Sequence, residues 1–179
     1  MNKIKMAVLA VALCGGLFTA RADTSTNTPT SINDFAQTAG SWFTSVDYTK
    51  SWPTNEIDFA LGGLWQNNNN WANYINVQKN VGSFAFDAEM DNAGVAGTIY
   101  RVQGGVGYRL LNRGDLSVHA FLNGGYDRAN KTAFAEPTIV LRKLMAHGAF
   151  AEISLGYDVL FKGQQPTTPG LRIGTGFTF

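Results

Sequence analysis

Residues 149–161 read AFAEISLGYDVLF, and this stretch decides the fold class. Apolar side chains occupy every second position from Ala149 to Phe161, and polar or small residues fill the positions between them from Glu152 to Asp158. A period of two is typical of a β-strand with one apolar and one polar face. Strands of globular proteins average about five or six residues, whereas a strand tilted across a membrane needs about nine to eleven. The length of this run therefore favours a transmembrane barrel over a sandwich.

Seven other runs show the same alternation, and turn-forming residues separate them. The run over 136–144 is the least regular, because Ile139 and Leu141 face one way while Val140 and Arg142 face the other. An even number of strands brings both chain ends to one side. We therefore predict an all-β fold over residues 56–179, an eight-stranded antiparallel up-and-down transmembrane β-barrel. The other seven runs are 56–66, 71–78, 83–90, 96–110, 116–127, 136–144 and 171–179.

The first 22 residues have the pattern of a signal peptide. Lys3 and Lys5 precede an apolar segment, residues 6–18, that is too short to span a bilayer. Residues 20–22, Ala-Arg-Ala, fit the rule for cleavage before Asp23. The alternatives are a buried N-terminal helix and a lipoprotein signal at Cys14, although the residue before Cys14 is not small. No later window approaches eighteen apolar residues, so we expect no transmembrane helix.

Residues 23–55 are interpreted as a linker and an amphipathic helix that precede the barrel. Residues 23–30 are rich in Thr, Asn and Pro, and from Ile32 to Val46 apolar residues recur at steps of three and four. The helix packs on the end of the barrel in one interpretation. In another it lies in a membrane interface with Trp42 and Phe43 among the headgroups. A frayed segment or an additional strand is the third alternative.

Composition excludes several classes of protein. Charged residues make up 15% of the chain, hydrophobic residues 45% and aromatic residues 12%, which is not the composition of a disordered chain. The formal net charge of +1 gives no indication of nucleic-acid binding. The single cysteine cannot form a disulfide framework or a multi-thiolate metal site. We expect no cofactor, no metal and no nucleic-acid partner.

Two features distinguish a membrane barrel from a soluble one, although both alternate in the same way. Aromatic residues lie near both ends of the apolar faces, as expected for two membrane interfaces. The polar faces are rich in glycine, as a narrow lumen requires. We therefore expect the charged side chains to fill the lumen in a salt-bridged network without an open pore. The predicted aromatic girdle is Trp65, Trp71, Tyr126 and Phe161 at one end and Tyr108 and Phe177, followed by Phe179, at the other. The predicted lumen network is Asp58, Asp87, Glu89, Arg101, Arg109, His119, Asp127, Arg142, Glu152, Asp158 and Arg172.

The last nine residues, LRIGTGFTF, resemble the closing strand of bacterial outer-membrane barrels, which ends in an aromatic residue. Residues 56–179 as a whole are similar in plan to the small OmpA-like and OmpX-like barrels. This resemblance implies a Gram-negative cell envelope, export through the periplasm, and outer-membrane lipid and the barrel-assembly machinery as partners. It also implies that Ile173, Phe177 and Phe179 form the assembly signal. The N-terminal helix and the short outer loops depart from this porin-like family.

The function expected from these features is a structural or surface role in the outer membrane, without catalysis. One alternative is a lipid-modifying enzyme, because a helix before eight strands also resembles the lipid A palmitoyltransferase. That family uses a histidine in the first strand and an Asp-Ser pair in an outer loop, and this chain has no histidine before His119 and no Asp-Ser pair. His119 is either a general base held by Asp127 or a hydrogen-bonded lumen residue.

A third alternative is an exported soluble barrel that binds a small apolar ligand, with both faces inverted. In that case Phe84, Phe86, Ile153 and Leu155 line a core. The acidic pairs Asp87/Glu89 and Glu56/Asp58 suit either Ca²⁺ or acid–base chemistry, and pairing with lumen arginines is the simpler interpretation.

Overall fold

The computed structural model describes residues 41–43, 45–66, 71–93, 98–128, 131–161 and 169–179. The chain divides into two compact units, Met1–Asp47 and Tyr48–Phe179. The predicted signal peptide lies outside the described residues, and so does most of the helix predicted over residues 32–46. Of that helix the structure describes residues 41–43, which are helical, and residues 45–46, which are not. No helix in these ranges is long and apolar enough to cross a lipid bilayer.

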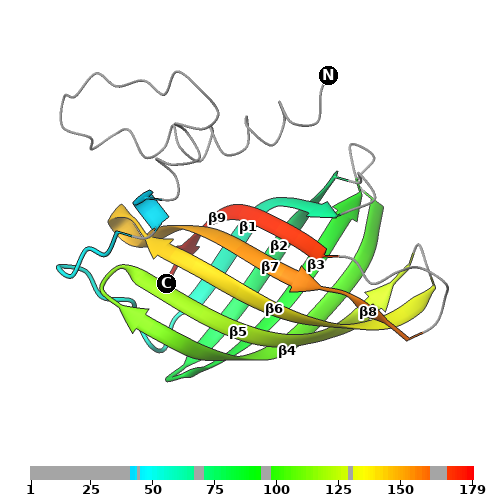
Figure 1. Cartoon of the computed structure of the whole chain (residues 1–179), viewed down its shortest axis with the longest axis horizontal. Coiled ribbons are helices and arrows are strands. Elements are labelled where there is room, and N and C mark those ends of the chain that lie inside the picture. The colour runs from blue at the N-terminus through cyan, green and yellow to red at the C-terminus, as the bar shows by residue number, and fades with distance from the viewer. Residues whose placement is uncertain (1–40, 44, 67–70, 94–97, 129–130, 162–168) are drawn as a thin grey trace, which may run out of the picture. The chain divides into compact units, whose positions relative to one another are not determined.

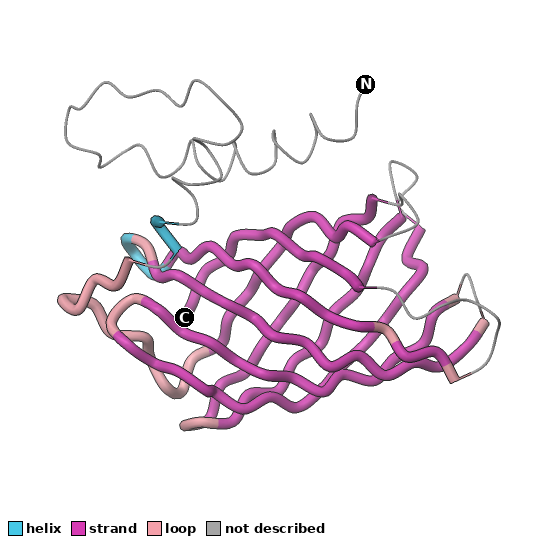
Figure 2. Tube along the Cα trace, viewed as in Figure 1, coloured by secondary structure: helices cyan, strands magenta, loops and turns pink. Residues whose placement is uncertain are grey.

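The second unit is a closed antiparallel β-barrel, which confirms the predicted fold class (Figures 1 and 2). Consecutive strands pair from β1 to β7, β9 pairs with both β7 and β1, and the pairing of β5 with β6 joins the two ends of the sheet. The short β8 continues β7 along the same neighbour, β6, so that the barrel wall has eight strands. The strands are β1 Ile57–Gln66, β2 Trp71–Val81, β3 Phe84–Ala93, β4 Thr98–Arg113, β5 Leu116–Asp127, β6 Thr132–Leu144, β7 Ala149–Tyr157, β8 Val159–Leu160 and β9 Pro169–Thr178.

The strand β6 starts earlier than the sequence predicted, at Thr132 rather than at residue 136. Its alternation is hard to recognise because Pro137 occupies an outward position in mid-strand. Proline has no N–H to donate to a neighbouring strand. The ladder to β7 and β8 is interrupted at this point, since Thr138 pairs with Gly156 and the next pair is Ala135 with Val159.

The two ends of the barrel differ in their connections. We call the end where Ile57 pairs with Phe179 the terminus end, and the opposite end the loop end. At the terminus end, two-residue turns join β2 to β3 and β4 to β5, and Gly82 and Gly114 have the positive φ angles of 63° and 60° that such tight turns need. The connections of the loop end lie mostly outside the described residues.

The strands separate their side chains by chemistry. Apolar side chains such as Leu122, which is 64% exposed, point outward, whereas most of the charged side chains of the strands are buried inside. Small residues make room for the large interior groups. A Cβ atom added to Gly62 or Gly174 would collide with the side chain of Tyr74, which crosses the lumen between them.

Candidate functional site

The charged interior of the barrel is the candidate site. All eleven residues of the predicted lumen network point inward. Asp87 is half-buried and the other ten are buried. Nine of them, all except Asp87 and Asp127, form three clusters along the barrel, which are described from the loop end to the terminus end.

The cluster nearest the loop end is centred on Glu136. Arg172 holds this carboxylate with two hydrogen bonds, from Nη1 to Oε1 at 2.7 Å and from Nη2 to Oε2 at 2.9 Å. Arg101 donates from Nη2 to Oε2 of the same carboxylate at 2.7 Å. Glu136 therefore bridges two guanidinium groups, and its paired geometry is the strongest form of this contact.

Further carboxylates surround the same two arginines. Arg101 also donates to Asp158 at 2.6 and 2.8 Å and lies 3.5 Å from Asp91, and its guanidinium carbon lies 3.8 Å from the ring centre of Phe134. Arg172 donates from Nε to Glu89 at 2.8 Å. Two cations thus serve four carboxylates in this part of the lumen.

The middle cluster is built around Arg142. Its Nη1 donates to Asp58 at 2.9 Å and its Nε donates to Glu152 at 2.8 Å. The hydroxyl of Tyr74 donates to the other oxygen of Glu152 at 2.6 Å, and the amide of Asn80 donates to Asp58 at 2.8 Å. Each of these carboxylates is shared between a cation and a neutral donor, which satisfies more of its acceptor capacity.

At the terminus end Arg109 contacts three groups. It donates to Glu56 at 2.9 Å, to the carbonyl oxygen of Pro53 at 2.9 Å and to Nε2 of His119 at 3.1 Å. Burial raises the pKa of the Glu56 carboxyl above its usual value, although Arg109 acts in the opposite direction.

The geometry around His119 does not support its assignment as a general base held by Asp127. Because Nε2 accepts from Arg109, the ring proton lies on Nδ1, the nitrogen that is 3.4 Å from the Ser117 hydroxyl. Asp127 lies eight residues further along β5, about 26 Å from His119 at the spacing of a β-strand. Its partner on the neighbouring strand is Thr132. The alternative interpretation, a hydrogen-bonded lumen histidine, agrees with these contacts.

A segment before the first strand closes the terminus end, and the sequence interpretation missed it. Trp52 is 2% exposed, its Nε1 donates to the carbonyl oxygen of Asp115 at 2.5 Å, and its ring lies 5.7 Å from that of Phe150. The backbone N–H of Gly82 donates to Thr54 at 2.8 Å. Residues 50–56 therefore belong structurally to the barrel unit. The available signal was the Trp-Pro pair at residues 52–53, three residues before the first strand.

Two lumen carboxylates were also missed. Asp91 was assigned to a turn, but β3 continues to Ala93 and keeps Asp91 on the same face as Asp87 and Glu89. Glu136 precedes the proline that obscures the alternation of β6. Glu56 was not placed in the predicted network, but the expected pairing of the Glu56/Asp58 pair with lumen arginines is what the structure shows, through Arg109 and Arg142. Continuing the two-residue step from Glu89 would have found Asp91, and following it back from Arg142 would have found Glu136.

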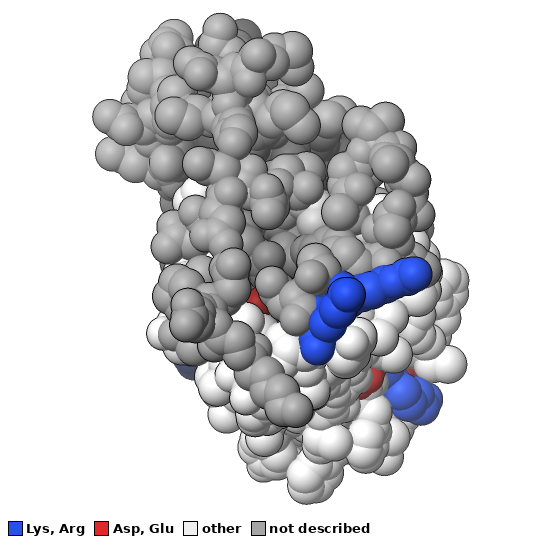
Figure 3. All heavy atoms as spheres, turned by 90° about the vertical axis from the view of Figure 1, so that its right-hand side faces the viewer, with Lys and Arg blue, Asp and Glu red and all other residues white. Residues whose placement is uncertain are grey.

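The predicted girdle residues whose side chains the structure describes lie on the outer face. Trp65, Tyr126 and Phe161 are exposed toward the loop end, and Tyr108 and Phe177 are exposed toward the terminus end. Trp71 begins β2, and its side chain is outside the described part. Of the predicted assembly signal, Ile173 is half-buried and Phe179 is exposed. Figure 3 shows that most of the described surface in that view is neither acidic nor basic.

The inverted arrangement that a soluble apolar-ligand barrel requires is wrong. Phe84, Phe86 and Leu155 are exposed on the outside, and the lumen that would hold an apolar ligand is lined by charges. The reason is that alternation fixes which residues share a face but does not fix which face turns inward. The charged face turns inward because the arginines and carboxylates of different strands pair with one another in the lumen.

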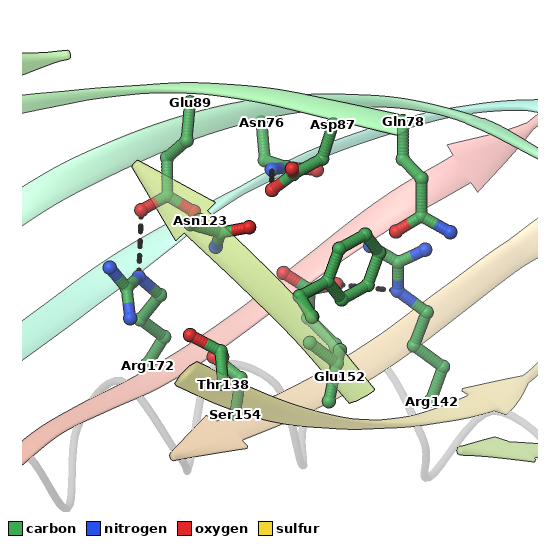
Figure 4. A pocket seen from close by; sticks show the side chains of 12 residues that line it. Asn76, Gln78, Asp87, Glu89, Asn123, Thr138, Arg142, Glu152, Ser154 and Arg172 are labelled. Atoms are coloured by element: carbon green, nitrogen blue, oxygen red, sulfur yellow. Dashed lines mark hydrogen bonds and ion pairs between the residues drawn. The ribbon is translucent and has the colours of Figure 1, made fainter. Parts of the chain in front are cut away.

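One small cavity lies inside the barrel, between the middle cluster and the loop-end cluster (Figure 4). Its volume is about 20 Å³, which is enough for about one water-sized occupant. Within the described part of the chain, no group of three or more His, Cys, Asp and Glu side chains has an arrangement that could hold a metal ion. Asn76, Asp87, Glu89, Asn123, Arg142, Glu152 and Arg172 are among the lining residues.

Comparison with known proteins gives a fold and no family. No family model matches the sequence. No curated protein matches it either. A solved structure described as "De novo design of transmembrane beta-barrels" is similar with a TM-score of 0.55 and 12% sequence identity, over 72% of this chain and 99% of that chain. The barrel therefore has the fold of a transmembrane-type β-barrel.

Proposed function

We propose that this protein is a bacterial outer-membrane β-barrel with a structural or surface role, a filled lumen and no catalytic activity. The observation that carries the proposal is the orientation of the two faces. Large apolar side chains are exposed around the whole outside of the barrel, and the described charges of the strands are mostly inside. Exposing such a surface to water is unfavourable, whereas lipid hydrocarbon removes that cost. Examples on successive strands are Leu61, Val77, Phe86, Val106, Leu122, Ile139, Leu155 and Phe177.

The dimensions of the wall support the same proposal. The strands other than β8 have nine to sixteen residues, which is enough for tilted strands to cross the hydrocarbon layer. Exposed aromatic residues at both ends agree with two lipid–water interfaces. Because short turns of such barrels face the periplasm, we place the terminus end on the periplasmic side.

The predicted signal peptide and the closing strand complete the proposal. The signal peptide would direct export into the periplasm. The closing strand would be recognised by the barrel-assembly machinery through Ile173, Phe177 and Phe179. Outer-membrane lipid is the proposed surrounding. A lipid-modifying activity gains no support, since the one lumen histidine is engaged with Arg109.

A filled lumen predicts the absence of a steady pore. The ion-pair clusters and Trp52 occupy the interior, and the cavity between them is about 20 Å³. Planar-bilayer recordings of the purified protein should therefore give no large, steady conductance. Large, steady conductance would contradict the filled lumen while leaving the membrane location intact.

The location itself is tested by fractionation and by labelling. The protein should be recovered with outer membranes and should show heat-modifiable mobility in gels. A bilayer-soluble thiol reagent should modify Leu122→Cys, whereas the adjacent lumen variant Asn123→Cys should be protected. Recovery in the soluble periplasm, or equal labelling of the two variants, would refute the proposal.

A further inference from the structure

Asp87 differs from most of the lumen carboxylates. Seven of them form ion pairs with the four lumen arginines, and Asp87 takes part in none of the ion pairs found among the described residues. Its nearest side-chain donor is Asn76, at a long 3.3 Å to Oδ2. Its other oxygen, Oδ1, accepts no hydrogen bond from the protein. A carboxylate inside a barrel without a cation is costly.

Two buried amides leave their oxygens unsatisfied beside it. Asn76 is 6% exposed and Asn123 is 4% exposed, and the Oδ1 atom of each accepts no hydrogen bond. The same small cavity is lined by Asn76 on β2, Asn123 on β5 and Asp87 on β3 (Figure 4). Gly105, which pairs with both Asp87 and Asn123, leaves room for the Asn123 amide, because a Cβ atom there would collide with its oxygen. All the unsatisfied atoms of this lining are acceptors.

The charge around the cavity favours a cation over water alone. The lining carries three carboxylates, Asp87, Glu89 and Glu152, and two guanidinium groups, Arg142 and Arg172. Both guanidinium groups are already shared between two carboxylates each. Water could donate to the free oxygens, but it would bring no positive charge to the Asp87 carboxylate.

We propose that this cavity binds one small monovalent cation, of the size of Na⁺, through the oxygens of Asp87, Asn76 and Asn123. Carboxylate and amide oxygens are the ligands that hard cations prefer. Asp87 is the one lining carboxylate that forms none of the ion pairs found among the described residues, and a monovalent ion matches its single charge. A divalent ion such as Ca²⁺ would bring twice that charge beside the guanidinium groups of Arg142 and Arg172. The volume excludes organic cations.

The proposal is tested by equilibrium urea unfolding of the full chain in detergent micelles, at constant ionic strength, with NaCl exchanged for choline chloride. Unfolding opens the lumen, so slow exchange through a filled barrel does not interfere. Above the dissociation constant, each tenfold rise in Na⁺ should raise the ratio of folded to unfolded protein about tenfold. Choline is too large for the cavity and should have no such effect.

Two variants and one diffraction experiment make the test specific. Asp87→Asn removes the charge without changing the shape and should abolish the Na⁺ response. Glu56→Gln removes a carboxylate outside the cavity and should retain it. Crystals of the wild type that has been unfolded and refolded in RbCl should give an anomalous peak beside Asp87, which is independent of whether either variant folds. Identical unfolding of the wild type in NaCl and choline chloride, an unchanged Na⁺ response in Asp87→Asn, or a water molecule without an anomalous peak would overturn the proposal.

Discussion

The outer wall and the lumen of this barrel are built from the same strands but follow different rules. On β7, Leu155 is exposed on the outside, while its neighbour Ser154 is buried in the lumen. An outward side chain needs only to be apolar, because its surroundings are uniform. An inward side chain needs a particular partner, as Glu136 needs Arg101 and Arg172. The wall should therefore tolerate exchange among apolar residues, whereas the lumen should not tolerate the loss of a partner.

The largest effect is expected in the lumen. Arg172→Met removes the guanidinium that neutralises Glu89 and Glu136, and should lower the free energy of unfolding by about 3–5 kcal/mol, as for other broken buried ion pairs. Urea unfolding in micelles measures it. Arg113→Met, at an exposed arginine 5.5 Å from the ring of Tyr48, is the control and should cost less than about 1 kcal/mol. Equal effects of the two substitutions would remove the distinction between lumen and wall.

A charge placed on the wall should have the next largest effect. Leu155→Arg at mid-strand should cost about 2–4 kcal/mol and reduce insertion into liposomes, while Phe161→Arg near the end of the strand should cost about 0–1 kcal/mol. The depth dependence follows from the distance to the lipid headgroups. Equal insertion of Leu155→Arg and wild type would show that this face does not contact hydrocarbon.

A smaller effect is expected where the lumen is closed by the segment before β1. Trp52→Phe keeps a ring against Phe150 but loses the hydrogen bond to the carbonyl of Asp115, which should cost about 1–3 kcal/mol. The same exchange on the wall, Trp65→Phe, leaves an apolar ring toward lipid and should cost less. Thermal unfolding followed by gel mobility compares them. A larger loss for Trp65→Phe would contradict the structural role of Trp52.

The smallest effect concerns chemistry rather than stability. Since His119 is engaged with Arg109, His119→Ala should leave the lipid composition of the outer membrane unchanged. Mass spectrometry of extracted lipids measures this in cells that express either form. A change in acyl chains with His119→Ala, absent with the neighbouring Ser117→Ala, would revive the enzymatic alternative.

Much of the fold could be predicted from the sequence, because alternation is a local property. The runs over 149–161 and 116–127 gave strand positions and faces that the structure confirms. The prediction failed where local chemistry interrupts the pattern. Pro137 hid the start of β6, and with it Glu136, and Asp91 resembled a turn residue because asparagine and glycine follow it. Trp52 could not be predicted to close the barrel, since no periodicity links it to Asp115.

The sequence alone determined which residues share a face, because neighbouring side chains of a strand must point to opposite sides. The tertiary structure excluded the inverted arrangement of the two faces, and it alone decided which arginine meets which carboxylate. Those contacts join strands that are far apart in the chain, as Arg172 and Glu89 are, and their geometry depends on the closure and register of the whole barrel. The same closure places Asp87 beside two unsatisfied amides, which the order of residues along the chain does not specify.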